Sequence, residues 1–491
     1  MEFDLVLVSL PAFTQHCPSL GLSALASYLT EKHYDIICYD FGVSFYKNWL
    51  KKFKIRNALV KQLGLSLYPL WGASNWLNFP EILNLTGQYI LESLCPVCSK
   101  LYHPIFVEFL TQSSYTQKIL DSYVDALVKL DSNVYAFSLL LGNAPASLYV
   151  LKKIKEKKPD VTIIVGGPEA SLHYRAMFYS QLDAIDFTVY HSEGEIPLDR
   201  LLAHLQGKIS KESVPGILFK NKEGIHKTKH PPFLDLNKLP IPNYELVEIG
   251  SKLDNLKSLD ILISKGCPYH CTFCNEPLIW GTYRPKNAQK IFEELYYYVT
   301  NYGITHFELG DNTFSASPSF LFALERLLKN GIKIKWNGNA RVNELNKQKL
   351  IQFHNLGLSH CYFGIESGSP KILELMGKRF NLTQASKVLQ FCYQQQINLS
   401  LYFIVGFPGE TQNDFQQTID FIAAHNKYIN DIVVSVFTLM PNTAMFNSKL
   451  LNPIQLGPNI LNAFTYQTTD GITHKERKKR FLILQQLKNQ L

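Results

Sequence analysis

The chain has 491 residues, of which 46% are hydrophobic and 18% are charged, and its formal net charge is +8. This composition excludes a disordered chain, and the length predicts two or three globular domains. The basic residues are spread along the sequence rather than gathered on one arm, which argues against nucleic-acid binding.

The N-terminus and the cysteine content indicate where the protein works. Met1–Asp4 contains acidic residues where a secretory signal peptide begins with basic ones. Apolar runs fall short of the ~20 residues that cross a bilayer. Nine cysteines without a secretion signal predict reduced thiols and metal ligands. We therefore expect a cytoplasmic protein with no membrane span.

The first 205 residues alternate between apolar runs and amphipathic stretches. This alternation predicts an α/β domain with a doubly wound, Rossmann-like parallel sheet over residues 1–205. Within it, the segment 43–131 is predicted to be a mostly helical insertion, and its role is open. The expected strands are 3–10, 35–39, 134–140 and 161–165, with helices at 18–30 and 145–157.

Residues 206–254 are predicted to be a linker, because prolines interrupt them and the helical period is lost. A short hairpin is expected around Asn221–Gly224. From residue 259 six strand–helix units follow, which predict a partial (β/α)6 barrel over 255–450 and a C-terminal helical tail over 451–491. In parallel barrels the reactive site lies at the carboxyl ends of the strands.

Three cysteines follow the first of these strands directly. Cys267, Cys271 and Cys274 have the spacing C-x3-C-x2-C, and soft thiolates so close together suit an iron–sulfur cluster. Only three thiolates are present, so one iron would keep an open coordination position. A zinc site completed by His270 and three cysteines without metal are the alternatives. The position in a barrel favours the cluster.

With this cysteine run at a strand end, the sequence resembles the radical S-adenosylmethionine (radical SAM) superfamily over about 259–442. The resemblance implies that the three cysteines bind a 4Fe–4S cluster whose fourth iron binds S-adenosylmethionine. One electron then cleaves a carbon–sulfur bond and gives a 5′-deoxyadenosyl radical, which abstracts hydrogen from the substrate.

The resemblance also implies S-adenosylmethionine contacts at successive strand ends. Asp311 takes the place of the family's usual glutamate, and Gly406–Thr411 is similar to the family's Gly-x-Pro-Gly-Glu-Thr turn. The residues so implied are Phe273, Gly310, Asp311, Asn339, Arg341, Glu366, Ser367 and Gly406.

The N-terminal half is similar to the cobalamin-binding subfamily. Its Gly-Gly-Pro and Gly-Glu-Gly-Glu turns are matched at 166–168 and 192–195, with Ser192 replacing a glycine. No Asp-x-His-x-x-Gly run supplies a histidine for cobalt, which fits the radical subfamily and also a domain that has lost cobalamin. The implied cobalamin residues are Ser138, Gly142, Gly166, Gly167, Pro168, Glu193 and Gly194.

The resemblance therefore implies a cobalamin-dependent methyltransferase acting on an unactivated carbon of a natural product or lipid. The substrate is expected to be a small molecule, a lipid or a peptide, and the electron donor a flavodoxin or ferredoxin. The alternatives are a radical enzyme with a vestigial cobalamin domain and a non-enzymatic metal-binding or RNA-associated protein. Cys95 and Cys98 are interpreted as ordinary thiols.

Overall fold

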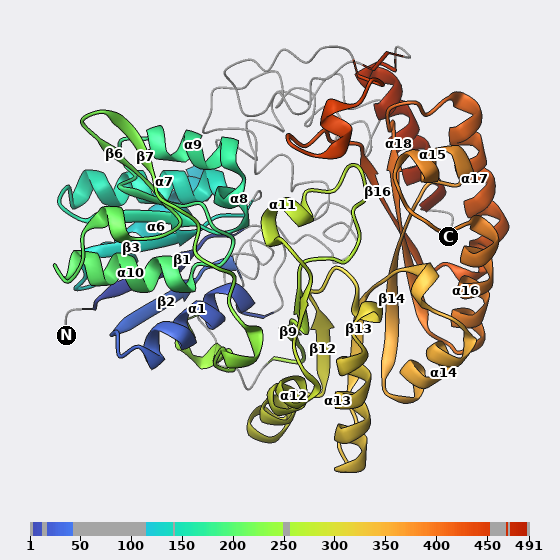
Figure 1. Ribbon diagram of the computed structural model, residues 1–491, viewed down its shortest axis with the longest axis horizontal. Helices are drawn as coiled ribbons and strands as arrows, with labels where there is room; N and C mark the ends of the chain where they lie inside the picture. Colours follow the sequence, from blue (N-terminus) through green and yellow to red (C-terminus); the bar gives the residue numbers. More distant parts are fainter. Residues whose placement is uncertain are drawn as a thin grey trace. The chain divides into compact units, whose positions relative to one another are not determined.

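The computed structural model describes residues 3–11, 17–42, 114–140, 143–248, 256–451, 468–469 and 472–488. Most of the predicted insertion, including Cys95 and Cys98, lies outside these residues, as does Gly142. The chain divides into two compact units (Figure 1). The first unit comprises Met1–Leu234 and Lys238–Leu256, and the second comprises Asp235–Asn237 and Lys257–Leu491.

The first unit is built on an eight-stranded sheet with the order β7-β6-β5-β4-β3-β1-β2-β8. Six neighbouring strands, from β5 to β8 in the sheet order, run parallel. The order 2-1-3-4-5 among them is a doubly wound arrangement and confirms the predicted fold class. The order reverses between β1 and β3, and such a switch point is where open sheets of this type bind ligands. The strands are β1 (Leu5–Ser9), β2 (Ile36–Asp40), β3 (Val134–Ser138), β4 (Thr162–Gly166), β5 (Phe187–Val189), β6 (Ile217–Asn221), β7 (Gly224–Lys227) and β8 (Val247–Glu248).

Helices bury both faces of this sheet, which explains why its strands are continuous apolar runs. Successive side chains point to opposite faces, so Val6 and Val8 join one core cluster whereas Leu5 and Leu7 join the other. The helices are α1 (Leu20–Glu31), α6 (Ser114–Val128), α7 (Ala144–Lys157), α8 (Pro168–Ser171), α9 (His173–Gln181) and α10 (Glu195–Leu205).

The segment predicted as a linker (206–254) differs from that expectation. It contributes β6, β7 and β8 to the first sheet, with β6 and β7 forming the hairpin expected around Asn221–Gly224. Ile217, Leu218 and Phe219 are buried in the sheet. Of the prolines that suggested a linker, Pro215 lies just before the hairpin and the others follow it. The strands themselves carry too few residues to show a clear period.

The second unit contains a six-stranded parallel sheet with the order β16-β15-β14-β13-β12-β9, as a partial (β/α)6 barrel requires (Figure 1). The strands are β9 (Leu259–Ile261), β12 (His306–Leu309), β13 (Lys335–Ala340), β14 (Leu358–Glu366), β15 (Asn398–Val405) and β16 (Asp431–Val436). A separate two-stranded ladder joins β10 (Ser264–Lys265) to β11 (Arg284–Pro285). The helices are α11 (Glu276–Trp280), α12 (Ala288–Tyr302), α13 (Pro318–Lys329), α14 (Lys347–Asn355), α15 (Pro370–Leu375), α16 (Leu382–Gln394) and α17 (Gln412–His425).

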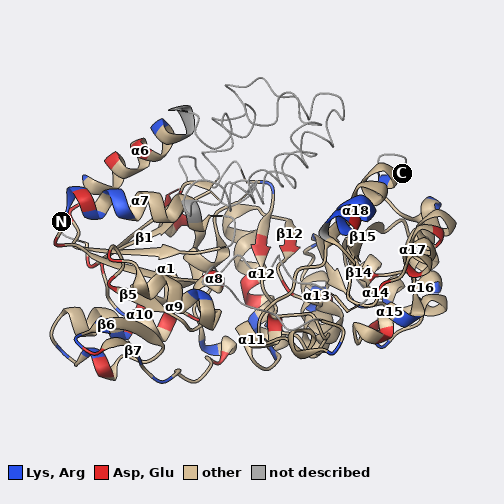
Figure 2. Cartoon of the chain, turned by 90° about the horizontal axis from the view of Figure 1, so that it is seen from above, with Lys and Arg blue, Asp and Glu red and all other residues tan. Residues whose placement is uncertain are grey.

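The predicted C-terminal helix is present as α18 (His474–Lys488), which contacts β16 and β15. Much of α18 is blue in Figure 2, the colour that marks Lys and Arg residues. Two of its arginines, Arg477 and Arg480, are buried. No helix in the described part of the chain is both long and apolar enough to cross a membrane.

Candidate functional site

The three cysteines share one loop between β10 and α11, at the carboxyl end of the barrel. Gly266 opens this loop with φ of +81°, and a Cβ there would lie 2.9 Å from the carbonyl oxygen of Thr282. Only glycine fits both the conformation and the close approach. Cys267, Cys271 and Cys274 are all partly exposed.

Backbone contacts hold the middle of the cysteine loop in place. The N–H of Thr272 donates to the carbonyl of Met376 at 3.0 Å, and its hydroxyl donates to the carbonyl of Leu375 at 2.8 Å. The Thr272 carbonyl accepts the N–H of Met445 at 2.8 Å. The loop is therefore fixed to two segments that follow α15 and β16.

The loop buries two of its thiols enough to change their pKa values. Burial raises the pKa of Cys274 to about 12 and also raises the pKa of Cys267, while neighbouring thiols add to both shifts. Against this, backbone N–H groups of Glu276 and Tyr269 lower the two pKa values and so favour thiolates. Metal coordination would deprotonate such thiols outright.

Within the described residues no three His, Cys, Asp or Glu side chains are grouped around one metal-ion position. A 4Fe–4S cluster does not require three ligands around one metal ion, because each of its cysteines binds a different iron. The three-thiol loop therefore fits a cluster better than a zinc site with His270, which is exposed.

Arg341, at the end of β13, lies directly against the cysteine loop. Its Nη1 atom is 3.4 Å from the sulfur of Cys271, and its guanidinium carbon is 3.8 Å from the ring centroid of Tyr269. Its Nη2 donates to the carbonyl of Lys378. The Tyr269 hydroxyl donates to Glu344 at 2.6 Å, so both sides of the stacked pair are fixed.

At the end of β12, Asp311 is buried and already hydrogen-bonded. Its carboxylate accepts the N–H of Ile263 at 2.9 Å and the hydroxyl of Ser264. Burial raises the pKa of Asp311 to about 6, although these donors oppose the shift. The neighbouring Asn339 amide donates to the Asp311 carbonyl at 3.0 Å.

Gly310 directly precedes Asp311 in this turn. A Cβ added to Gly310 would come close only to the side chain of Leu262. A contact of Asp311 with S-adenosylmethionine stays a prediction.

At the end of β14, Glu366 and Ser367 have different surroundings. Glu366 has φ of +69° and forms an ion pair with the buried Lys378 at 3.1 Å. Ser367 is wholly buried, and its hydroxyl lies 3.3 Å from the hydroxyl of Thr418. Of the two, Glu366 is the better placed to meet a ligand. Lys378 was not predicted, since nothing in its sequence neighbourhood marks it.

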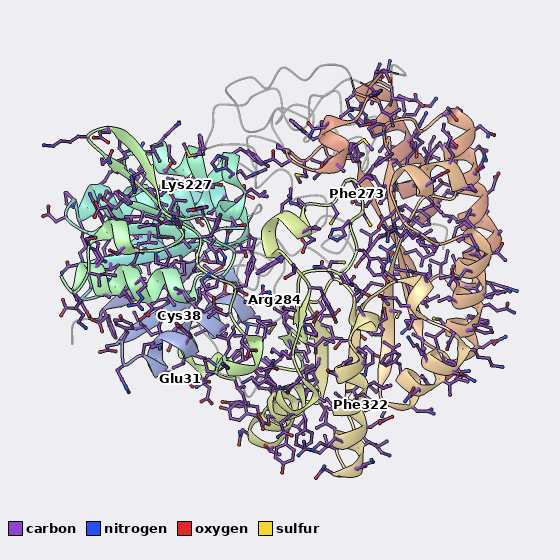
Figure 3. The ribbon with its side chains drawn as sticks, viewed as in Figure 1. Glu31, Cys38, Lys227, Phe273, Arg284 and Phe322 are labelled. Carbon is purple, nitrogen blue, oxygen red and sulfur yellow. The ribbon has the colours of Figure 1, made fainter. Side chains whose placement is uncertain are left out.

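The turn after β15 is packed against α18. Gly406 has φ of +71°, and a Cβ there would overlap the side chain of Arg477. Its N–H donates to the buried carboxylate of Glu410 at 2.7 Å. Phe273, labelled in Figure 3, lies at an edge-to-face distance of 6.2 Å from the ring of Phe407 in this turn.

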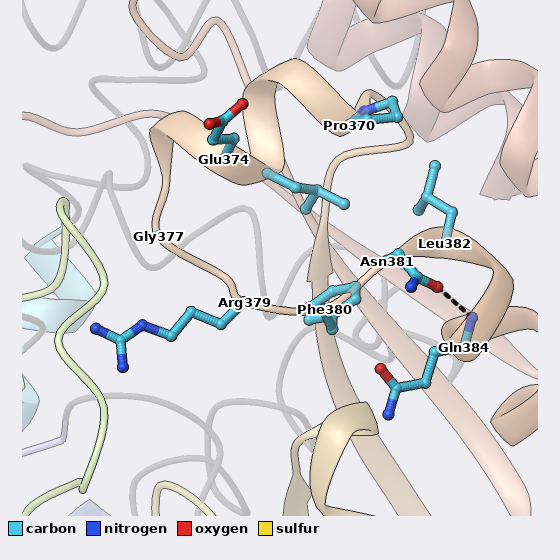
Figure 4. A pocket seen from close by; sticks show the side chains of 9 residues that line it. Pro370, Glu374, Gly377, Arg379, Phe380, Asn381, Leu382 and Gln384 are labelled. Atoms are coloured by element: carbon cyan, nitrogen blue, oxygen red, sulfur yellow. Dashed lines mark hydrogen bonds between the residues drawn. The ribbon is translucent and has the colours of Figure 1, made fainter.

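A surface cavity of about 460 Å³ lies beside the cysteine loop (Figure 4). Gly377 lines it and also lies against His270 and Cys271. The Arg379 side chain extends away from the other lining side chains, while the Asn381 side chain caps α16 by accepting the N–H of Gln384 at 2.8 Å.

In the first unit, the predicted cobalamin residues lie at the carboxyl edge of the sheet. Gly167 has φ of +95°, and a Cβ there would lie 2.8 Å from the carbonyl oxygen of Leu139 and 3.3 Å from the Ser138 hydroxyl. A Cβ on Gly166 would lie 3.2 Å from Val189. The close packing of neighbouring strand ends thus requires these glycines.

The neighbouring turn after β5 is also tightly packed. The Glu193 carboxylate accepts the N–H of Leu234 at 2.9 Å, and a Cβ on Gly194 would lie 3.2 Å from Leu25. The Ser192 hydroxyl is buried without a hydrogen-bond partner among the described residues. Pro168 begins α8.

Sequence reasoning missed Asn143 at the switch point. Its amide accepts the N–H of Leu140 at 2.7 Å and donates to the carbonyls of Ser138 and Leu10 at 3.0 and 3.3 Å. It therefore joins the ends of β1 and β3. Asn143 lies just before the predicted helix at 145–157, and this position was the sequence feature that could have marked it as a structural residue.

Comparison with known proteins identifies the second unit. Residues 261–422 match the radical SAM superfamily. This protein is a radical SAM enzyme. Enzymes of this superfamily carry a 4Fe–4S cluster, use S-adenosylmethionine and need a reductant.

Two curated relatives resemble this radical SAM enzyme over much of its length. An uncharacterized methyltransferase of Pyrococcus horikoshii is 25% identical over 380 residues, which are 75% of this chain and 81% of the relative. The anaerobic magnesium-protoporphyrin IX monomethyl ester cyclase of Rubrivivax gelatinosus is 25% identical over 278 residues. The match covers 55% of this chain and half of the cyclase.

Two solved structures share the fold of this radical SAM enzyme. The cobalamin-dependent radical enzyme OxsB, with aqua-cobalamin and S-adenosylmethionine bound, matches 91% of this chain and 60% of its own with a TM-score of 0.63 and 16% identity. The methyltransferase TsrM from Kitasatospora setae, with cobalamin and a 4Fe–4S cluster bound, matches 91% of this chain and 74% of its own with a TM-score of 0.61 and 13% identity.

Proposed function

We propose that this radical SAM enzyme is a cobalamin-dependent methyltransferase that acts on an unactivated carbon of a small molecule. The observation that carries the proposal is the pairing of two units in one chain. A cysteine loop at the strand ends of a parallel barrel is joined to a doubly wound sheet whose order reverses between β1 and β3. The methyltransferase names of the Pyrococcus relative and of TsrM support it.

Cys267, Cys271 and Cys274 would hold the cluster, and residues at the barrel's strand ends would hold S-adenosylmethionine. Bound there, the cluster would supply one-electron reduction of S-adenosylmethionine, and cobalamin would supply a carrier for the methyl group. Arg341 supplies positive charge beside Cys271. Glu366 would accept hydrogen bonds from a ligand hydroxyl or amine while Lys378 holds its carboxylate in place.

The carboxyl edge of the first sheet would hold cobalamin. Ser138, Gly166 and Gly167 lie beside the switch point, where a ligand of an open sheet binds. The unpartnered Ser192 hydroxyl at the same edge offers a buried hydrogen-bonding group. Because the Asp-x-His-x-x-Gly run is missing, the cobalt would take no histidine from that motif.

We further propose a flavodoxin or ferredoxin as the reductant and the cytoplasm as the location. The reaction needs single electrons at low potential, which these proteins deliver. The seven described cysteines are all free, as expected in a reducing compartment.

A second candidate is radical chemistry without methylation, such as the cyclisation named for the Rubrivivax relative. It would use the same cysteine loop, and the first unit would bind cobalamin for another purpose or serve only as a scaffold. A methylated product separates the two candidates.

The experiment is anaerobic reconstitution with iron, sulfide and hydroxocobalamin, followed by counting iron and cobalt per chain. We expect about four irons and about one cobalt. A triple variant, C267A/C271A/C274A, should lose the iron and keep the cobalt, whereas Cys392→Ala, a buried cysteine on α16, should keep both. If the triple variant kept its iron as Cys392→Ala does, the cluster site would be refuted. Iron without cobalt would refute cobalamin dependence.

A further inference from the structure

The barrel sheet has one apolar face and one mostly polar face. Pairing places Phe307 beside Trp336 on the buried face and Glu308 beside Asn337 on the other. The apolar face is buried against the helices, as the alternating exposure of β12 and β13 shows. We call the opposite side the inner face. Its further polar and aromatic members, by register, are Asp260, Asn339, His360, Tyr362, Ser400, Tyr402 and Asp431, and its apolar members include Ile404 and Val433.

A carboxylate and two phenols meet at the middle of the inner face. Glu308 accepts a hydrogen bond from the amide of Asn337 at 2.9 Å. Burial raises the pKa of Tyr362, and the negative charge of the nearby Glu308 raises it further. The rings of Tyr362 and Tyr402 are parallel within 2°, with centroids 6.3 Å apart. His360 stacks on Tyr362 at 4.6 Å, and its Nε2 lies 2.9 Å from the Ser400 hydroxyl. Glu308 and both tyrosines are only partly buried, so a ligand can reach them.

Glu308, which lies beside Asp260 in register, differs from Asp431 and Glu366 in its lack of a counter-charge. Asp431 pairs with Lys488 at 2.9 Å and Glu366 pairs with Lys378 at 3.1 Å. Within the described residues no cation forms an ion pair with Glu308. A partly buried carboxylate with neutral donors alone retains attraction for a positive charge.

The cluster lies within reach of the reactive end of the barrel. Glu308 precedes Gly310 by two residues and Tyr362 precedes Glu366 by four, along strands that rise ~3.3 Å per residue. The carboxylate is therefore about 7 Å below the strand end in the direction of the strand. A small molecule anchored there would present its other end to the S-adenosylmethionine residues.

We propose that Glu308, Tyr362 and Tyr402 form a substrate-binding site for the ammonium group of an amine-bearing small molecule. The inference rests on the proposed function and adds its substrate class. A carboxylate flanked by aromatic rings is a favourable partner for an ammonium group, by ion pairing and cation–π attraction. The polar inner face makes an entirely apolar lipid or an anionic substrate a poor match.

The test uses the reconstituted, S-adenosylmethionine-bound full chain without reductant, so that no turnover occurs. Binding of cyclohexylamine, cyclohexanol and cyclohexanecarboxylate is measured by ligand-observed NMR at neutral pH. These probes share one ring and differ in the charge of one substituent. We expect the amine to bind tightest and the carboxylate weakest. Glu308→Gln should weaken the amine about tenfold and leave the alcohol within about twofold.

Two controls keep the result specific. Glu293→Gln makes the same change on an exposed position of α12 and should leave amine binding unchanged. Tyr402→Phe retains the ring and should retain most of the preference for the amine. Equal binding of amine and carboxylate, no saturable amine binding, or an unchanged amine affinity in Glu308→Gln would each overturn the inference. Iron content and S-adenosylmethionine binding, measured on the same samples, report separately on the proposed function.

Discussion

Arg480 Nη1 lies 2.6 Å from the Oε2 atom of Glu410, and the two side chains are only 5% and 1% exposed. The same carboxylate oxygen accepts the N–H of Gly406, and Arg480 also donates to the Glu410 carbonyl at 2.9 Å. An arginine of the last helix thus fixes the turn after β15. This turn is one of the segments through which the barrel is expected to hold S-adenosylmethionine.

Arg480→Met should therefore destabilise the second unit and weaken S-adenosylmethionine binding. The substitution leaves the Glu410 carboxylate buried without its partner, which costs about 3–5 kcal/mol. Urea unfolding gives the stability, and equilibrium dialysis gives the affinity for S-adenosylmethionine. The double variant with Glu410→Gln should lose less than the sum of the two single variants. Strict additivity would show that the two side chains are not coupled.

Gly406→Ala tests the same turn from the backbone side. Alanine at φ of +71° is strained by about 1 kcal/mol or more, and its Cβ would overlap Arg477. Gly303→Ala, at φ of +64° with nothing within 4 Å, provides the control for strain alone. We expect Gly406→Ala to lower the unfolding free energy more than Gly303→Ala does. Equal losses in the two variants would mean that Arg477 moves aside freely.

Asp311 should make stability depend on pH in a defined direction. Burial raises its pKa in the folded chain to about 6, whereas an unfolded aspartate titrates near ~3.9. Between these values the folded state holds a proton that the unfolded state has released. Stability from this group therefore falls as pH rises from about 4 to about 6, by at most about 3 kcal/mol.

The measurement is urea unfolding of cluster-free protein across this pH range, for the wild type and Asp311→Asn. The asparagine carries no titrating group, so the wild-type curve minus the variant curve should slope downward with rising pH and level off above about 6. Parallel curves for the two proteins would contradict the raised pKa.

Local patterns were sufficient to predict the strand–helix alternation. Strands such as 398–405 are largely apolar runs buried by helices, and the helix that follows, α17, keeps a 3.6-residue period of buried side chains. The cysteine loop was predicted because its chemistry lies in adjacent residues. β6, β7 and β8 were assigned to a linker because they are short and flank a proline-rich stretch.

The partners of the predicted site residues could not be derived from local patterns. The contact of Arg480 with Glu410 joins residues 70 positions apart, and the contact of Asp311 with Ser264 spans 47. The inner-face cluster was missed for a related reason. Glu308, Tyr362 and Tyr402 each interrupt an apolar strand as a single polar or aromatic residue, and only sheet register brings them together.

Arg341 should raise the reduction potential of the cluster. Its Nη1 atom lies 3.4 Å from the Cys271 sulfur, where a positive charge and an N–H donor stabilise the more negative, reduced cluster. Arg341→Gln should shift the midpoint potential downward by about 60 mV, the equivalent of tenfold for one electron. Arg341→Lys keeps the charge but loses the stack on Tyr269, so its potential should fall between the two. An electron paramagnetic resonance redox titration without S-adenosylmethionine gives all three midpoint potentials. An unchanged potential in Arg341→Gln would show that the charge of this arginine does not stabilise the reduced cluster.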